Sequence, residues 1–431
     1  MLVGQGVVMA QRRVVVTGIG VVAPGGTGTK AFWERITSGR PATRAITAFD
    51  PAPFRSRIAG ECDFDPIVAG LAEQDVLRLD RAAQMLMIAA REALADSEPG
   101  ITHDTAHRTG VSIGNAVGLT QKLEREYLAV SDGGREWTVD PAAASEHLYD
   151  YFVPSSLAAE VAWFAGAEGS ASVVSAGCTS GIDATGHAWE LIREGSADIM
   201  IAGGTDAPVA PITVACFDVI KATSPRNDEP ESASRPFDRT RNGFVLGEGA
   251  AVLVLEEYGR ARRRGAHVYA EISGYASHGN AHHMTGLRSD GREMAAAITS
   301  ALDRARLDPT TVDYVNAHGT ATQQNDRHET AALKRSLGAH AHTVPVSSIK
   351  SMIGHSLGAI GAIEIAACAL AMEHGIVPPT ANLHRPDPEL DLDYVPLIAR
   401  EKRLDTVLTV GSGFGGFQSA MVLNHQDRRA A

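Results

Sequence analysis

Two stretches of this chain show the same order of features, and this internal repeat constrains the fold more than any other part of the sequence. In the first, the apolar stretch "ASVVSAG" leads into Cys178, and the helical run "SGIDATGHAWELIREG" and the strand-like "ADIMIAGG" follow. In the second, "TVPVSSIKSMIG" leads into His355, and "SLGAIGAIEIAACALAMEHG" follows. Each stretch places a reactive side chain at the start of a helix that is too apolar for a surface helix.

The rest of the chain alternates strand-like and helix-like segments. "RRVVVTG", "TGVSIG", "VDYVNAHG" and "TVLTVGSG" read as strands, and residues 71–95, 289–306 and 326–337 read as helices. This alternation predicts an α/β layered architecture. A duplicated α/β unit, with buried helices between sheets, is the simplest arrangement that uses both stretches. We place the two halves at residues 10–265 and 266–431.

Composition and charge exclude several classes of protein. The chain has 431 residues, of which 44% are hydrophobic, so it can bury a sizeable core. Its formal net charge of −12 argues against a nucleic-acid binder, but a local basic patch that docks an acidic carrier protein is compatible with it. Neither a secretion signal nor a membrane span is predicted. The first convincing strand begins just after Met9, so residues 1–9 are expected to be a disordered extension, and the start is Met1 or Met9.

The cysteines indicate the compartment. Four are present, without any C-x-x-C spacing: Cys62, Cys178, Cys216 and Cys368. Neither a zinc site nor a disulfide framework is therefore predicted, and a reducing, cytoplasmic compartment fits best. Cys216 and Cys368 are expected to be small buried core residues.

The sequence "GHSLG" at 354–358 matches the G-x-S-x-G nucleophile elbow of serine hydrolases and acyltransferases. An elbow needs a buried strand before its serine, and Lys350 and Ser351 suit such a strand poorly. The motif is also short and rich in glycine, so chance matches are common. We expect Ser356 to be a packing residue at a helix start, and a serine nucleophile is the alternative.

Two further patterns suggest ligands that we do not expect. "GIGVVA" at 18–23 matches the dinucleotide-binding fingerprint after a strand. A proline and two glycines follow at once, where the fingerprint needs an uninterrupted helix, so we expect a tight turn and no nicotinamide cofactor. "SHGNAHHMTG" contains three histidines, but their spacing fits no standard ligand set, so no metal is predicted at His278, His282 and His283.

Cys178 has the strongest chemical signal, because it lies between a β-branched strand and a helix that begins with "TSG". A thiol at a helix N-terminus meets the positive end of the helix dipole and unpaired N–H groups, which lower its pKa. Cys178 is therefore predicted to be a nucleophile at neutral pH. His318 ends the strand in "VNAHG", and His355 starts a helix. One nucleophile and two donors are what an acyl-transfer and carbon–carbon bond-forming site requires.

Five motifs, in order, resemble those of the β-ketoacyl synthases of the thiolase-like fold, from Arg13 almost to the C-terminus. "VSAGCTSG" is similar to the nucleophile motif, "SRPFDRTRNGFVLGEGA" to an internal signature, and "GSGFGGFQSA" to a C-terminal glycine-rich loop. "VNAHGTATQQND" and "SIKSMIGHSLGAIGAIE" are similar to the two histidine motifs. The resemblance implies two duplicated α/β halves in a layered αβαβα architecture. The two histidines distinguish this Cys-His-His type from the thiolase type and from the chain-initiating type.

Within this family the chain is most similar to the ketosynthase α subunit of bacterial type II polyketide synthases, especially the aromatic ones. The similarity rests on "FDPAPFRSRIAGECDFDP", "LDRAAQMLMIAAREAL", "GCTSG" and "YFVPSSLAAEVAW". The companion chain length factor usually replaces the active-site cysteine, so Cys178 places this chain on the catalytic side. One alternative is the homodimeric β-ketoacyl carrier protein synthase II of fatty acid elongation, and another is a non-elongating partner subunit. Ala321 is the one small departure from the family pattern.

The resemblance implies a decarboxylative Claisen condensation that extends a poly-β-ketone chain. Cys178 would carry the acyl chain, and the backbone N–H groups of Cys178 and Phe414 would hold the oxyanion. His318 and His355 would stabilise the enolate that forms when malonyl carrier protein loses CO2. Phe414 would also act as a gate between the two steps.

The resemblance also assigns supporting residues and partners. Lys350 and Glu364 would support the histidines, and Thr320 and Thr322 would bind the pantetheine arm. No cofactor or metal is implied, because acyl carrier protein delivers the substrates on phosphopantetheine. The chain length factor is expected as the partner in a heterodimer, and neither nucleic acid nor membrane is an expected partner.

Overall fold

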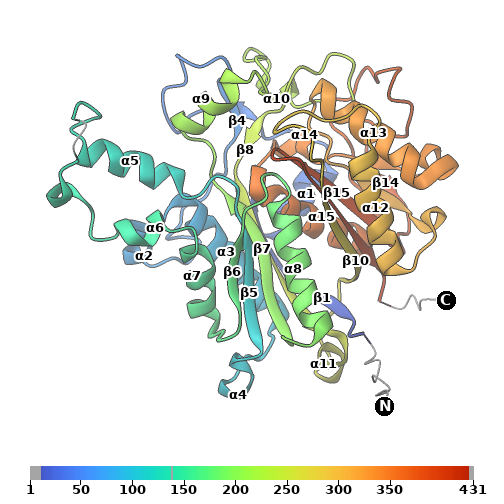
Figure 1. Ribbon diagram of the computed structural model, residues 1–431, viewed down its shortest axis with the longest axis horizontal. Coiled ribbons are helices and arrows are strands. Elements are labelled where there is room, and N and C mark those ends of the chain that lie inside the picture. Colours follow the sequence, from blue (N-terminus) through green and yellow to red (C-terminus); the bar gives the residue numbers. More distant parts are fainter. Residues whose placement is uncertain (1–10, 137–138, 427–431) are drawn as a thin grey trace, which may run out of the picture.

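A sheet of 11 strands runs through the molecule in the order β12-β11-β15-β16-β10-β1-β9-β7-β5-β6, with the short β2 paired to β1 (Figure 1). The structure is a computed structural model that describes residues 11–136 and 139–426. The expected extension over residues 1–9 and the choice between Met1 and Met9 lie outside the described residues.

The two halves of the sheet repeat one strand order. The first set, in chain order, is β1 (Val14–Ala23), β5 (Thr109–Gly114), β6 (Ala171–Val174), β7 (Ile199–Asp206) and β9 (Gly249–Glu257). The second set is β10 (Ala270–Gly279), β11 (Tyr314–Asn316), β12 (Val346–Ser347), β15 (Thr406–Gly413) and β16 (Phe417–Asn424). We number the strands of each set by their order in the chain. From the outer edge of the sheet to its middle, both sets then read third, second, fourth, fifth, first. The two sets join where β1 pairs antiparallel with β10. The repeated order is the duplication that the sequence predicts.

Helices form the remaining layers. The helices of these layers are α1 (Thr29–Thr37), α3 (Arg81–Ser97), α7 (Ser156–Ala165), α8 (Ser180–Glu194), α12 (Arg292–Ala305), α13 (Gln323–Leu337) and α15 (Ile360–His374). α8 and α15 contact each other and strands of both sets, so they form the buried middle layer. α3 and α7 cover the first set from outside, and α12 covers the second set beside α13. The result is the layered, thiolase-like α/β fold.

The remaining elements connect these layers, and some of them are buried. The strands are β2 (Gly26–Thr27), β3 (Arg44–Ala45), β4 (Ile58–Gly60), β8 (Leu246–Gly247), β13 (Ile376–Val377) and β14 (Arg400–Glu401). The α-helices are α2 (Glu73–Arg78), α4 (His103–Ala106), α5 (Thr120–Val130), α6 (Leu148–Phe152), α9 (Pro211–Val219), α10 (Pro230–Ala233), α11 (Tyr258–Arg263) and α14 (Lys350–Ile353). The 3-10 helices are η1 (Pro141–Ala143), η2 (Pro309–Thr311), η3 (Gly338–His342) and η4 (Leu357–Ala359). α5 and α6 project to the left in Figure 1.

Glycines let the two middle helices approach closely. A Cβ on Gly181 of α8 would lie 2.6 Å from the backbone nitrogen of Ala362 in α15. A Cβ on Gly361 would likewise lie 2.7 Å from the backbone nitrogen of Ile182. Close packing of this kind explains why "TSG" and "LGAIGA" follow the two reactive positions.

Several local expectations are confirmed and several are wrong. The turn that we expected around "GIGVVA" is present at Pro24 and Gly25, but residues 18–23 are themselves part of β1. The helix expected over 71–95 is two helices, because Asp80 interrupts it and caps α3 by accepting a bond from the N–H of Ala82 at 2.9 Å.

The cysteines differ from expectation at one position. All four are free thiols, and Cys368 is buried in α15 as expected. Cys216 is exposed, so the expectation of a core position is wrong. In the short helix α9, the face that packs inward carries Thr213, Val214 and Phe217, and Cys216 falls outside that face.

The segment Leu357–His374 is long and apolar enough to cross a membrane, but 89% of it is buried inside the protein. A core helix of a layered fold has the same composition as a membrane span. Its burial therefore assigns it to the middle layer.

Candidate active site

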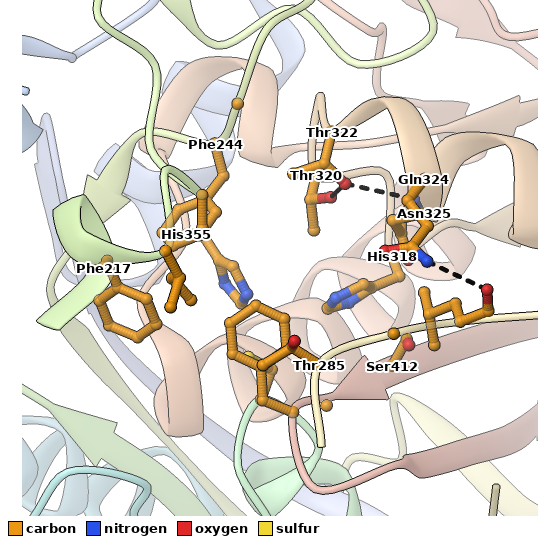
Figure 2. Close-up of a pocket in the computed structure, with 18 of the residues that line it drawn as sticks. Phe217, Phe244, Thr285, His318, Thr320, Thr322, Gln324, Asn325, His355 and Ser412 are labelled. Carbon is orange, nitrogen blue, oxygen red and sulfur yellow. Dashed lines mark hydrogen bonds between the residues drawn. The ribbon is translucent and has the colours of Figure 1, made fainter. Parts of the chain in front are cut away.

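Six of the residues predicted for the site line one pocket of ≈ 360 Å³: Cys178, His318, Thr320, Thr322, His355 and Phe414. Figure 2 shows the two imidazoles pointing into the same part of this pocket. Cys178 follows β6, the third strand of the first set, and His355 follows β12, the third strand of the second set. The repeat thus brings the two reactive positions together across the middle layer.

The loop that carries Phe414 lies directly against the cysteine turn. Gly177 has a φ of 58°, and a Cβ at this position would lie 2.8 Å from the carbonyl oxygen of Phe414. The backbone N–H groups of Phe414 and Cys178 both act to lower the pKa of the Cys178 thiol. Two backbone N–H donors therefore converge on the sulfur.

The expectation of a lowered pKa at Cys178 is wrong. Burial raises the pKa of the thiol to about 12, against the opposing charge of Lys350 and the N–H donors. Cys178 packs in an apolar cluster with Phe217 and Leu357, and an environment of this kind disfavours the thiolate. The thiol is therefore protonated in the free protein at neutral pH.

His318 and His355 form a pair of neutral imidazoles. Their ring centroids lie 5.3 Å apart at an interplanar angle of 85°. Burial, and then the charge of Lys350, hold the pKa of both well below the usual value for histidine. Within the described chain, the buried Nδ1 atoms of both have no hydrogen-bond partner. A proton there would lack an acceptor, so Nε2 is the better place for it.

His318 is held by acidic residues of α13 that the sequence analysis missed. The carboxylate of Glu329 accepts bonds from the backbone N–H groups of His318 at 2.6 Å and Gly319 at 2.8 Å. Burial raises the pKa of Glu329 to about 8. The helix that directly follows "HGTAT" contains acidic residues, and this contact could have been predicted from them.

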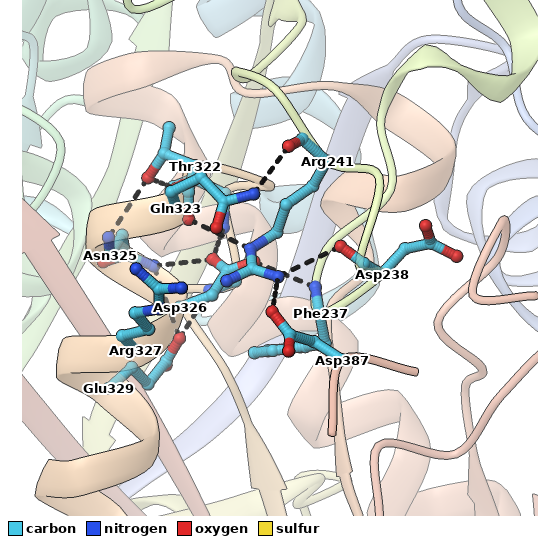
Figure 3. Close-up of polar contacts among 12 residues, drawn as sticks. Phe237, Asp238, Arg241, Thr322, Gln323, Asn325, Asp326, Arg327, Glu329 and Asp387 are labelled. Carbon is cyan, nitrogen blue, oxygen red and sulfur yellow. Dashed lines mark hydrogen bonds and ion pairs between the residues drawn. The ribbon is translucent and has the colours of Figure 1, made fainter. Parts of the chain in front are cut away.

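A buried ion-pair network continues this support (Figure 3). Asp326 accepts bonds from the backbone N–H groups of Thr320 at 3.2 Å and Phe237 at 2.9 Å. Arg241 pairs with Asp326 at 3.2 Å and with Asp387 at 2.7 Å. The network therefore joins the loop at 226–243 to the start of α13.

Thr320 and Thr322 line the pocket with their hydroxyl groups 3.0 Å apart. Thr322 also caps α13, because its hydroxyl accepts a bond from the N–H of Asn325 at 3.2 Å. Between them Ala321 has a φ of 66°, which lies in the left-handed region that favours glycine. A residue with a Cβ therefore occupies a backbone conformation that favours glycine at this departure from the family pattern.

His355 is held through its backbone by the segment that precedes β9. Its N–H donates to the carbonyl of Val245 at 2.8 Å, and its carbonyl accepts from the N–H of Gly247 at 2.9 Å. The ring of Phe244 packs edge-on against the imidazole at 5.4 Å. The "FVLGEG" part of the internal signature therefore positions a histidine that lies over 100 residues further along the chain.

Ser356 has none of the surroundings of an elbow nucleophile. The helix α14, not a strand, precedes it. Its side chain is buried, and its hydroxyl has no hydrogen-bond partner in the described part of the chain. It is absent from the described residues that line the pocket.

Lys350 and Glu364 form an ion pair behind the pocket, with side-chain exposures of 1% and 0%. Burial raises the pKa of Glu364 to about 7, and Lys350 opposes this shift. The charge of Lys350 lowers the pKa values of Cys178, His318 and His355. Both residues therefore lie outside the pocket, and Lys350 acts electrostatically on Cys178 and on both histidines.

The histidine-rich loop lines the pocket through Asn280 and Met284, but its three histidines are not among the described lining residues. His282 and His283 have ring centroids 6.5 Å apart, and His278 contacts the hydroxyl of Ser300 at 3.1 Å. Over residues 11–136 and 139–426, the structure contains no group of three or more His, Cys, Asp or Glu side chains placed to hold a metal ion.

A thiol, a converging pair of N–H donors and two neutral imidazoles, on a duplicated α/β fold, are the groups of an enzyme that transfers acyl groups. Family models for the N-terminal and C-terminal domains of β-ketoacyl synthases match residues 11–261 and 269–384. The chain belongs to the β-ketoacyl synthase family, and it is an acyltransferase of that family.

Relatives from polyketide pathways are highly similar. "Oxytetracycline polyketide putative beta-ketoacyl synthase 1" of Streptomyces rimosus is 67% identical over 419 residues, covering 97% of this chain and 98% of the relative. The tetracenomycin polyketide synthase ketoacyl synthase alpha subunit of Streptomyces glaucescens is 66% identical, covering 96% and 97%. The 3-oxoacyl-[acyl-carrier-protein] synthase 2 of Coxiella burnetii is 40% identical, covering 96% and 99%.

Solved structures agree with this picture. One is AntDE:AntF, a type II polyketide synthase acyl carrier protein in complex with its ketosynthase bound to the hexaketide. It is 40% identical with a TM-score of 0.89, covering 96% of this chain and 100% of that chain. The ishigamide ketosynthase/chain length factor is 34% identical with a TM-score of 0.86, covering 96% and 99%.

Proposed function

We propose that this chain is the ketosynthase α subunit of a type II polyketide synthase, which extends a poly-β-ketone chain by decarboxylative Claisen condensation. The observation that carries the proposal is the convergence of Cys178, His318 and His355 in one pocket. The polyketide assignment is supported by identities of 66% and 67% to polyketide synthases, against 40% to the fatty-acid type.

In the first step the Cys178 sulfur attacks the thioester carbonyl of an acyl chain on acyl carrier protein. The carbon–sulfur bond to the carrier breaks, and the thiol proton of Cys178 leaves with the pantetheine sulfur. The N–H groups of Cys178 and Phe414 hold the oxyanion, and donors of this kind contribute about 2.7–4 kcal/mol each. Because the thiol pKa is raised, attack and loss of the proton are coupled.

In the second step malonyl carrier protein enters and its carbon–carbon bond to the carboxylate breaks, releasing CO2. The electron pair delocalises onto the thioester oxygen, where His318 and His355 donate hydrogen bonds from Nε2. The carbanion attacks the acyl-Cys178 carbonyl and forms the β-ketoacyl chain on the carrier. Cys178 leaves as a thiolate and takes up a proton from solvent, which restores the starting enzyme.

Other residues, in the pocket and behind it, set access and charge. Thr320 and Thr322 bind the pantetheine arm, and Phe414 gates the pocket between the two steps. Burial, and then the ammonium of Lys350, keep the imidazoles neutral, because both disfavour a positive charge on the rings. Glu364 pairs with that ammonium. The substrates come on phosphopantetheine, and no metal or other cofactor takes part.

The partners follow from the same proposal. Acyl carrier protein delivers both substrates, as in the complex of a related ketosynthase with its carrier protein. A chain length factor forms the heterodimer, as in the ishigamide ketosynthase/chain length factor. The enzyme works in the cytoplasm, where its free thiols stay reduced.

The test is mass spectrometry of carrier-bound products made from malonyl carrier protein. The chain is assayed alone and then with a co-expressed chain length factor. Elongation to a poly-β-ketone only with the second subunit is the expected result. Efficient single-step elongation of acyl chains by this chain alone would assign it to the alternative, a homodimeric synthase of fatty acid elongation.

A further inference from the structure

Asp206 is a fully buried carboxylate at the end of β7 that the condensation mechanism does not use. Its Oδ1 accepts bonds from the side-chain amide of Asn115 at 2.8 Å and the N–H of Val117 at 3.2 Å. Its Oδ2 accepts bonds from the N–H groups of Ala116 at 3.0 Å and Gly358 at 2.6 Å. One carboxylate therefore joins the loop after β5 to the turn η4.

This turn forms part of the pocket wall beside the nucleophile. Leu357 lines the pocket and has a φ of 47°, a left-handed conformation that is unfavourable for leucine. Asp206 accepts a hydrogen bond from the backbone N–H of the next residue, Gly358. A Cβ on Gly358 would lie 2.5 Å from Asp206 Oδ2, so glycine is needed for this contact. Asp206 thus holds Leu357 in a conformation that its own backbone preference opposes.

The carboxylate also affects the thiol. Among the described residues, no lysine or arginine forms an ion pair with Asp206, so its charge is balanced only by N–H donors. Burial raises the pKa of Asp206 to about 7, and the nearby Asp80 raises it further. Asp206 in turn raises the pKa of Cys178, whereas Lys350 lowers it.

We infer that Asp206 is a positioning residue that sets both the shape and the charge of the site around Cys178. Through Gly358 it fixes the Leu357 wall, and through its negative charge it opposes ionisation of the thiol. A protonated thiol is less open to reaction with stray electrophiles while no acyl chain is bound. The inference rests on the proposed role of Cys178 as the nucleophile.

The test compares Asp206→Asn with the wild-type enzyme. The rate of Cys178 alkylation by iodoacetamide is followed across a pH series by mass spectrometry of the Cys178 peptide. Removal of the charge is expected to move the profile to lower pH and to make alkylation about threefold faster at about pH 8. The kcat of condensation is expected to fall, because the Leu357 wall loses its fixed position. An alkylation profile that stays in place or moves to higher pH would overturn the inference.

A second variant keeps the inference testable if Asp206→Asn does not fold. Asn115→Ser removes one donor from the carboxylate, which favours its neutral form, so the alkylation profile should shift in the same direction by a smaller amount. Asp183→Asn is the matched control. Asp183 is another buried carboxylate, on α8, which accepts bonds from three hydroxyl groups: those of Thr179, Tyr275 and Ser419. A shift of equal size in this control would show a general effect of neutralising buried carboxylates and would also overturn the inference.

Alkylation needs no carrier protein and no second subunit. The outcome of alkylation therefore tests the role of Asp206, while mass spectrometry of the carrier-bound products tests the polyketide activity. The two can fail independently.

Discussion

The surroundings of the two side chains separate Cys178 from the nearby Ser356. The pocket gives Cys178 two N–H donors and two imidazoles, whereas Ser356 is buried without a hydrogen-bond partner in the described chain. Cys178→Ala is therefore expected to abolish loading from acyl carrier protein, and Ser356→Ala to leave loading nearly intact. Peptide mapping of the acylated protein checks both. An acyl group found on Ser356 would contradict the assignment.

The protonation state of the two imidazoles gives a second prediction at this scale. Burial and Lys350 lower the pKa of His318 and His355, so both should stay neutral when pH falls through the usual value of about 6.5. In the unfolded chain these histidines take up protons there, so they contribute stability that is lost as pH falls. Nitrogen NMR of histidine-labelled protein, assigned with His318→Gln and His355→Gln, measures the titration directly. A midpoint near the usual value for either ring would be evidence against neutral donors.

Between elements, the ion pair of Lys350 and Glu364 joins α14 to α15. Glu364→Gln leaves a buried ammonium without its partner, and loss of one member of a buried pair typically costs about 3–5 kcal/mol in the free energy of unfolding. Lys350→Met should cost less, because Glu364, with a pKa raised to about 7, can become neutral by taking up a proton. Urea unfolding of both variants measures the difference. Equal losses would mean that Glu364 stays ionised without its partner.

The arrangement of elements was predictable where the pattern is local. The β-branched runs identified β1, β5, β7 and β15, and the repeated order of strand, reactive residue and apolar helix identified the duplication. The long strands β9, β10 and β16 were not predicted from the sequence. The structure adds contacts between residues far apart in sequence, such as Glu329 with the backbone of His318 and Val245 with the backbone of His355. The raised pKa of Cys178 has the same origin. It comes from an apolar cluster assembled from segments far apart in the sequence, which an argument from the helix terminus alone does not include.

For the whole molecule, the site exists only where the two halves meet. Cys178 comes from the first set of elements, and His318 and His355 come from the second. The glycine contacts between α8 and α15 fix the distance between these two sets. The division at residues 265 and 266 stays a prediction, supported by the repeated strand order. Duplication thus supplied a nucleophile on one copy and donors on the other.

This shared interior predicts how the molecule unfolds. The strands β1 and β10 pair across the junction, and α15 packs against β9 and β7 of the first set as well as β15 of the second. Neither half can keep its middle helix buried without the other, so the halves should unfold together. Calorimetry of the full chain is expected to show one transition whose van't Hoff and calorimetric enthalpies agree. Two resolved transitions would mean that the halves are independent domains, and the glycine-packed middle layer would then be an interface between them and not a common core.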